Sequence, residues 1–215
     1  MNLFYIQIIG FILFIFYIIM ELSIKFVESK LLLKEIDIDM KDYIKNILEE
    51  NNITEIEILT EEEEIYFYSS KEDGEEIKEI SILPKNIEFN LICNLHEVGH
   101  AINNKKRSYF KNVFLNCCYY ISNVFFYIFG IAALFYFLDY SFLFNIVKII
   151  FFITLLSNIF ILIEEFKASE NGFKMLKKIN ITKPTNSLFI YIPYYLSYIF
   201  KFCFTFFLFA LLLLC

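Results

Sequence analysis

Two histidines bracket a glutamate in the segment His96-Glu97-Val98-Gly99-His100, and the chain contains no other histidine. Residues four apart lie one above the other on a helical face, so both imidazoles can bind one Zn²⁺ through neutral nitrogens. Glu97 follows His96 at about 100° around the helix, where its carboxylate can take a proton from a metal-bound water. This pattern predicts one Zn²⁺ per chain and hydrolysis of peptide bonds by a zinc-bound water.

A catalytic zinc site with two histidines needs a third protein ligand. Cys93 shares a helical face with both histidines, but it lies about 10 Å from His100 along the axis, too far for one tetrahedral ion. The other candidates are three acidic residues near the end of an apolar run: Glu164, Glu165 and Glu170. A helix there puts Glu165 and Ser169 on one face, so Glu165 could bind metal while Ser169 supports a histidine ring. Spacing alone does not separate Glu164 from Glu165.

The composition is typical of a membrane protein. Hydrophobic residues make up 58% of the 215 residues, with 28 Phe and a mean hydropathy of +0.57, more than a soluble surface tolerates. Of the 25 acidic residues, 21 lie between Glu21 and Glu97, so apolar runs alternate with a polar segment. The net charge of -6 and the lack of a basic stripe exclude a nucleic-acid partner.

Four apolar runs predict about four transmembrane helices, over residues 3–20, 113–138, 142–163 and 188–214. The first run is 18 residues long, or about 27 Å as a helix, close to the thickness of a bilayer core. The second and third are separated by a very short turn, which predicts a helical hairpin. The fourth contains Pro193 and Lys201, so it is either a kinked helix or a surface segment followed by a shorter span.

The two polar segments, residues 21–112 and 164–187, carry 17 of the 19 Lys and Arg residues. Cytoplasmic segments of membrane proteins are enriched in these residues. We therefore expect a multi-pass protein of the cell membrane, surrounded by the lipid bilayer, with its active site facing the cytoplasm.

The first polar segment is predicted to form a small α+β domain. Its expected elements are a helix over 39–51, a strand over 53–59, a hairpin over 65–82 and a helix that begins within 86–90 and ends near 104. Asp39 can cap the first helix, and the Asp73-Gly74 turn is typical of a hairpin. The last helix carries the histidines, while 164–187 is expected to be a cytosolic helix with the third zinc ligand.

Two motifs resemble a known family, the bacterial membrane zinc metallopeptidases typified by YugP, with a more distant similarity to HtpX-type membrane proteases. The matching segments are His96-Glu97-Val98-Gly99-His100-Ala101-Ile102 and Glu165-Phe166-Lys167-Ala168-Ser169. The resemblance implies a zincin-like domain of the gluzincin-like type, in which Glu165 is the third ligand and Ser169 supports a histidine. Lys167 departs from the acidic residue of the YugP type, and the HtpX type has Asp where Ser169 stands.

These features together predict an integral-membrane zinc metalloendopeptidase that acts on membrane or misfolded proteins. Because Glu165 lies two residues beyond Ile163, the metal is expected at the cytosolic membrane surface. The alternative is a non-catalytic membrane scaffold or adaptor with a structural zinc site. Glu97 distinguishes the two, because a structural site has no need of an unliganded carboxylate beside the metal.

Overall fold

The computed structural model describes residues 11–12, 15–16, 18–20, 22–23, 34–60, 66–72, 75–123, 141–179 and 184–214. The described chain is mostly helical, with one three-stranded sheet. It divides into two compact units. We call Leu22–Asn112 with Glu164–Tyr194 the polar unit, and Met1–Glu21, Val113–Ile163 and Tyr195–Cys215 the apolar unit.

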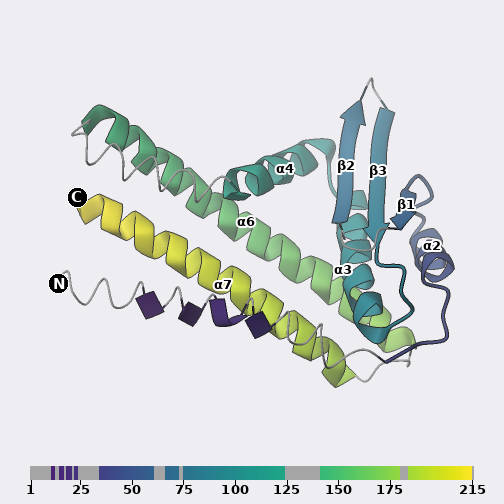
Figure 1. Ribbon diagram of the computed structural model, residues 1–215. Coiled ribbons are helices and arrows are strands. Elements are labelled where there is room, and N and C mark those ends of the chain that lie inside the picture. The colour runs from purple at the N-terminus through teal and green to yellow at the C-terminus, as the bar shows by residue number, and fades with distance from the viewer. Residues whose placement is uncertain are drawn as a thin grey trace. The chain divides into compact units, whose positions relative to one another are not determined.

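The sheet of the polar unit consists of β1 (Glu57–Thr60), β2 (Tyr66–Glu72) and β3 (Glu75–Ile82). Strand β3 lies in the middle, antiparallel to β2 and parallel to β1 (Figure 1). Ile80 of β3 is fully buried and pairs with Ile58 on one side and Phe67 on the other. The predicted hairpin is confirmed, although its Asp73-Gly74 turn lies outside the described residues.

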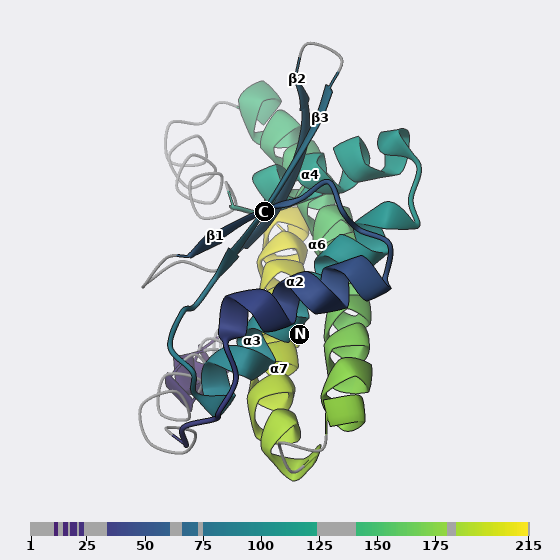
Figure 2. The ribbon, with the colours of Figure 1, turned by 90° about the vertical axis from the view of Figure 1, so that its right-hand side faces the viewer.

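Two helices complete the core of the polar unit. Helix α2 (Met40–Glu50) begins after Asp39, whose side chain accepts a hydrogen bond from the Asp42 backbone N–H at 3.0 Å, as its type and position predict. Helix α3 (Glu88–Lys105) packs against β2 and β3, and α2 packs against α3 and β1 (Figure 2). The buried side chains between them are mainly aliphatic: Met40, Ile44, Leu48, Ile80, Ile82, Leu91, Ile92, Leu95 and Val98.

Polar contacts fix the first half of α3. The fully buried Asn94 accepts a hydrogen bond from the Leu83 N–H at 2.9 Å and donates one to the Leu83 carbonyl at 3.0 Å. The Glu88 N–H, which has no partner within the helix, donates to the Lys34 carbonyl at 2.9 Å. The helix is therefore held in place before the histidine motif begins.

The apolar unit contains most of α4 (Tyr109–Asn123), the first part of α6 (Ser141–Ile179) and the last part of α7 (Pro184–Leu214). A buried chain of hydrogen bonds links these helices within the unit. Ser122 Oγ donates to Asn158 Oδ1 at 2.6 Å, and Asn158 Nδ2 donates to Thr205 Oγ1 at 3.4 Å. All three polar side chains therefore have partners although they lie among apolar residues.

The prediction of about four transmembrane helices is wrong. Within the described part of the chain, one helix, Asn145–Lys178, is long and apolar enough to cross a membrane, and Tyr198–Phe207 is a shorter apolar helix. Most of the predicted span 3–20, and residues 124–138 of the second, lie outside the described residues. Helix α4, which contains the described part of the second predicted span, is 15 residues long, shorter than the roughly 20 that a span needs.

Candidate metal centre

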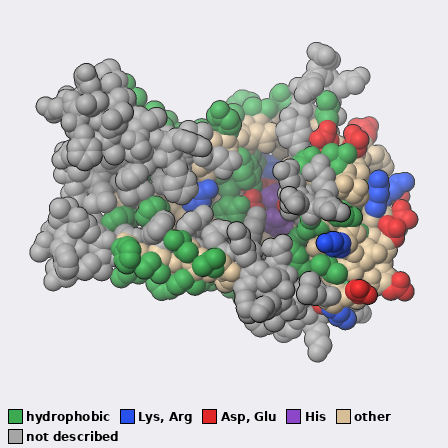
Figure 3. Space-filling model, viewed as in Figure 1, with side chains coloured by type: hydrophobic (Ala, Val, Ile, Leu, Met, Phe, Trp, Pro, Cys, Tyr) green, Lys and Arg blue, Asp and Glu red, His purple; other side chains and the backbone are tan. Residues whose placement is uncertain are grey.

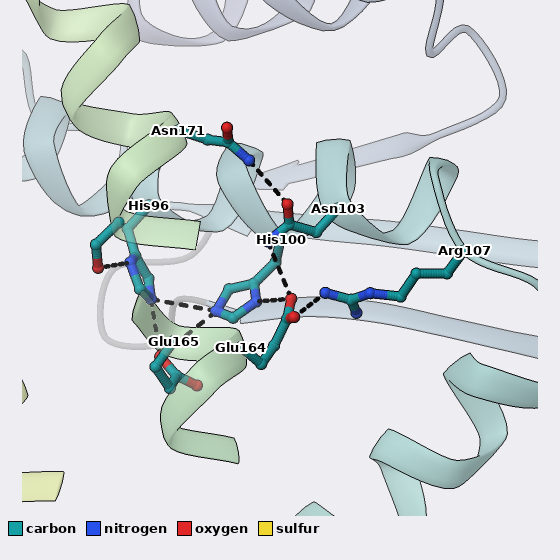
Figure 4. A network of polar contacts seen from close by, with 8 residues as sticks. His96, His100, Asn103, Arg107, Glu164, Glu165 and Asn171 are labelled. Carbon is teal, nitrogen blue, oxygen red and sulfur yellow. Dashed lines mark hydrogen bonds and ion pairs between the residues drawn. The ribbon is translucent and has the colours of Figure 1, made fainter. Parts of the chain in front are cut away.

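Three side chains from two helices converge within the polar unit: His96 and His100 of α3 and Glu165 of α6. His96 Nε2 lies 3.1 Å from Glu165 Oε2 and 3.2 Å from His100 Nε2. His100 Nε2 lies 3.6 Å from the same Glu165 oxygen. Figure 4 shows the three side chains pointing toward one another. The structure thus brings together the three residues expected to bind the metal.

These separations fit one tetrahedral zinc ion. Ligand atoms about 2.0–2.1 Å from zinc lie roughly 3.3 Å from one another at a tetrahedral angle. The observed distances of 3.1, 3.2 and 3.6 Å are close to that value. Two imidazole nitrogens and one carboxylate oxygen are also the ligand types of a catalytic zinc site with an open fourth position.

A hydrogen-bond partner at Nδ1 orients each imidazole. His96 Nδ1 lies 2.8 Å from Ser169 Oγ, and His100 Nδ1 lies 3.4 Å from Glu164 Oε1. When Nδ1, the outer nitrogen of each ring, has such a partner, Nε2, the inner nitrogen, is available to a metal. Ser169 is buried and contacts a histidine ring, the kind of contact that the family resemblance implies for it.

A close approach of α3 and α6 places the ligands opposite one another. A Cβ atom added to Gly99 would overlap the Ala168 carbonyl oxygen, so a side chain at Gly99 would force the helices apart. Gly99 directly precedes His100, and Ala168 lies between Glu165 and Ser169. The glycine in the first motif therefore brings the second motif within reach of the histidines.

Glu164 does not join the ligand group. Its carboxylate faces His100 Nδ1, accepts a hydrogen bond from Asn103 Nδ2 at 3.2 Å and pairs with the Arg107 guanidinium (Figure 4). Asn171 Nδ2 in turn donates to Asn103 Oδ1 at 2.8 Å. Spacing alone did not separate Glu164 from Glu165. In the structure, Glu165 lies beside the Nε2 atoms of both histidines, whereas Glu164 contacts Nδ1 of His100.

The two remaining candidates lie elsewhere. Among the described residues, neither Cys93 nor Glu170 belongs to the convergent group. Glu170 is exposed and pairs with Lys174 at 2.7 Å. Cys93 is half-buried on α3, three residues before His96.

The charges around the centre favour a divalent cation. Three carboxylates, Glu97, Glu164 and Glu165, and one guanidinium, Arg107, leave a net charge of -2 when the imidazoles are neutral. Burial lowers the pKa of His100, but the charge of Glu165 and its hydrogen bond outweigh burial and raise that pKa above its ordinary value. A positive charge at this point is therefore stabilised.

The centre is accessible from outside. Histidine atoms, coloured purple, are visible in the face of the molecule drawn in Figure 3. The side chain of His100 is 13% exposed, and Glu97 is half-buried, whereas Glu165 is only 3% exposed. A small ligand can therefore reach His100 and Glu97, whereas His96 is buried beside them.

The spacing of the sequence also pointed to Asn103 and Arg107, the two residues that contact Glu164. Asn103 follows His100 at an interval of three, which places it on the same face of α3 as both histidines, and Arg107 follows four residues later, just beyond the end of α3. That spacing could have identified Asn103 and Arg107 as neighbours of the two histidines. No comparable pattern marks Asn171, whose partner lies 68 positions away.

The comparisons with known proteins agree with this chemistry. A family model described as "Putative neutral zinc metallopeptidase" matches residues 4–188, a range that contains His96, His100, Glu165 and Ser169. No curated protein and no solved structure matches the chain. The more distant similarity to HtpX-type proteases stays a prediction. Because the family match covers most of the 215 residues, the chain belongs to this YugP-type family of zinc metallopeptidases.

Proposed function

We propose that the protein is a membrane-bound zinc endopeptidase in which His96, His100 and Glu165 hold the metal and Glu97 is the general base. The convergence of His96 Nε2, His100 Nε2 and Glu165 Oε2 within 3.1–3.6 Å of one another carries this proposal. Zn²⁺ bound there would polarise the scissile carbonyl and lower the pKa of the attacking water. With glutamate as the third ligand, the enzyme would be of the gluzincin-like type.

Glu97 is suited to proton transfer rather than to metal binding. It follows His96 directly on α3, and its side chain is half-buried while those of Glu164 and Glu165 are buried. Its carboxylate oxygens would accept a proton from water during attack and deliver it to the leaving amide nitrogen. A purely structural zinc site would have no use for this carboxylate.

The continuity of α6 supports a location at the membrane surface. Ile149, Phe152 and Ile153 are exposed apolar residues on the first part of α6, and Glu165 follows on the same helix. Such an apolar stretch is suited to lipid contact. The substrates would then be membrane proteins, or misfolded proteins at the membrane.

The charges after the apolar stretch support a cytoplasmic site. Lys174, Lys177 and Lys178 lie in the last turns of α6. Lys residues next to a span favour the cytoplasmic side. Protease digestion of inside-out and right-side-out vesicles tests this orientation: cleavage after Lys174 or Lys177 in right-side-out vesicles alone would contradict it.

The catalytic proposal is tested with purified protein in detergent. We expect Glu97→Gln to keep the zinc content of the wild type while cleavage of unfolded casein falls by at least about 100-fold, the usual contribution of a general base. Glu170→Gln, an exposed change on α6, serves as the control and should retain both zinc and cleavage.

Two outcomes would contradict this proposal. Full cleavage by Glu97→Gln would remove the role of Glu97. Zinc-loaded wild-type protein that cleaves no unfolded or membrane-protein substrate would favour the scaffold alternative.

A further inference from the structure

Glu164 is a buried carboxylate beside the metal centre that the proposed chemistry does not use. Its side chain is 6% exposed, and each of its oxygens has a partner. Oε1 lies 3.2 Å from Asn103 Nδ2 and 3.4 Å from His100 Nδ1, while Oε2 pairs with Arg107. A buried carboxylate with this many donors is held in one orientation.

The position of Glu164 next to Glu165 makes the contact with Arg107 necessary. Two adjacent buried carboxylates repel each other, and an uncompensated buried charge is strongly unfavourable. Arg107 compensates the charge of Glu164, which leaves Glu165 as the carboxylate opposite the two Nε2 atoms. Glu164 therefore pairs with Arg107, while the adjacent Glu165 faces the two histidines.

The same contacts connect three parts of the polar unit. His100 and Asn103 lie in the last turns of α3, Arg107 lies in the short connection before α4, and Glu164 lies on α6 (Figure 4). The hydrogen bond from Asn171 to Asn103 adds a second tie to α6. Displacement of Arg107 would therefore free Glu164 and, through it, the ring of His100.

We propose that Glu164 is a positioning residue that holds His100 with its proton on Nδ1 and its Nε2 toward the metal, and that Arg107 holds Glu164 in turn. A carboxylate on the outer nitrogen fixes the ring of a ligating histidine and makes the inner nitrogen a better donor. This inference rests on the proposed zinc site. Glu164 itself touches neither metal nor substrate.

The test uses Co²⁺ in place of zinc, because the visible absorption of bound Co²⁺ reports the geometry of its ligands. Full-length wild type, Glu164→Gln and Arg107→Gln are compared in detergent, with Glu170→Gln as the matched change at an exposed site of α6. Zn²⁺ and Co²⁺ affinities are measured by chelator competition, and spectra are recorded at saturating Co²⁺. Each variant is first checked for native helix content.

We expect Glu164→Gln to weaken Zn²⁺ binding by about 10–100-fold, the usual effect of losing such a partner. Its saturated Co²⁺ spectrum should also shift, which a loss of folded protein alone would not produce. Arg107→Gln should change both quantities in the same direction and by less, while Glu170→Gln should match the wild type. If Glu164→Gln does not fold, the Zn²⁺ affinity and Co²⁺ spectrum of Arg107→Gln test the positioning role instead.

Unchanged affinity and spectrum in the folded variants would overturn the positioning role while leaving the zinc site intact. A wild type that binds neither Zn²⁺ nor Co²⁺ would instead overturn the proposed zinc site itself. The two failures are therefore distinguishable.

Discussion

His96 and His100 differ in the group that holds the outer nitrogen. Ser169 offers His96 a neutral hydroxyl, whereas Glu164 offers His100 a charged carboxylate. A charged carboxylate on Nδ1 orients an imidazole more strongly than a neutral hydroxyl does. The charge of Glu165 and its hydrogen bond, which outweigh burial, also raise the pKa of His100.

This difference predicts how metal binding depends on pH. Only a neutral imidazole binds zinc, so protons compete with the metal for His100. Because the pKa of His100 is raised, competition begins at higher pH than for an ordinary imidazole, whose pKa is about 6.5. We expect zinc affinity to fall as pH is lowered through the raised pKa, as measured by chelator competition. Affinity that stays constant to well below pH ~6.5 would contradict this.

At the residue scale, the sequence predicted the three convergent side chains better than the residues that contact them. The spacing of His96, Glu97 and His100 specifies chemistry directly, because residue type and helical period are both visible in the sequence. Glu164 and Glu165 are adjacent and identical in type, so only the packing of α6 against α3 shows which of them faces the histidines.

At the element scale, the contact of α3 with α6 depends on glycine. Helix α3 begins and ends close to its predicted bounds, and the cap at Asp39 is confirmed, because both follow from local patterns. The approach of Gly99 to Ala168 joins positions 69 apart in the chain, which no local pattern encodes. The elements were therefore predictable, and their packing was not.

We predict that Gly99→Ala destabilises the protein and weakens zinc binding. The new Cβ would overlap the backbone carbonyl of Ala168, which cannot move without shifting α6. Overpacking of this kind costs about 1–3 kcal/mol. Thermal unfolding and zinc affinity, both measured in detergent, provide the check.

Gly172→Ala is the matched control on α6. Its new Cβ would lie 2.8 Å from the Tyr191 hydroxyl, the end of a side chain, and 3.1 Å from the Leu95 carbonyl oxygen. The better helix propensity of Ala, about 1 kcal/mol, would offset part of the cost. Equal stability and zinc affinity in the two variants would show that the contact at Gly99 is not decisive.

At the scale of the whole molecule, one helix carries both an apolar stretch and part of the metal centre. Helix α6 runs without interruption from Ser141 to Ile179, through the predicted span 142–163 and into the predicted polar segment. Composition predicted that membrane-type stretches exist, but it did not fix the length of each apolar helix. Among the described residues, Asn145–Lys178 is long enough to span a membrane, whereas Tyr198–Phe207 is too short.

We predict that α6 anchors the protein through its apolar face. Phe152 is 47% exposed there, so Phe152→Lys would place a charge in lipid at a cost of about 2.5–3.5 kcal/mol. The fraction retained in membranes after an alkaline carbonate wash should fall. Glu170→Lys, beyond the apolar stretch on the same helix, should leave retention unchanged, and equal retention of both variants would contradict the anchor.

In the proposed site, two histidines and one glutamate hold a single zinc ion with a fourth position open. X-ray absorption spectroscopy of the purified, zinc-loaded protein measures these ligands. We expect a shell of nitrogen and oxygen ligands at about 2.0–2.2 Å that includes two imidazoles, with no sulfur. A thiolate at about 2.3 Å would contradict it, because a cysteine would then hold the metal in place of the open position.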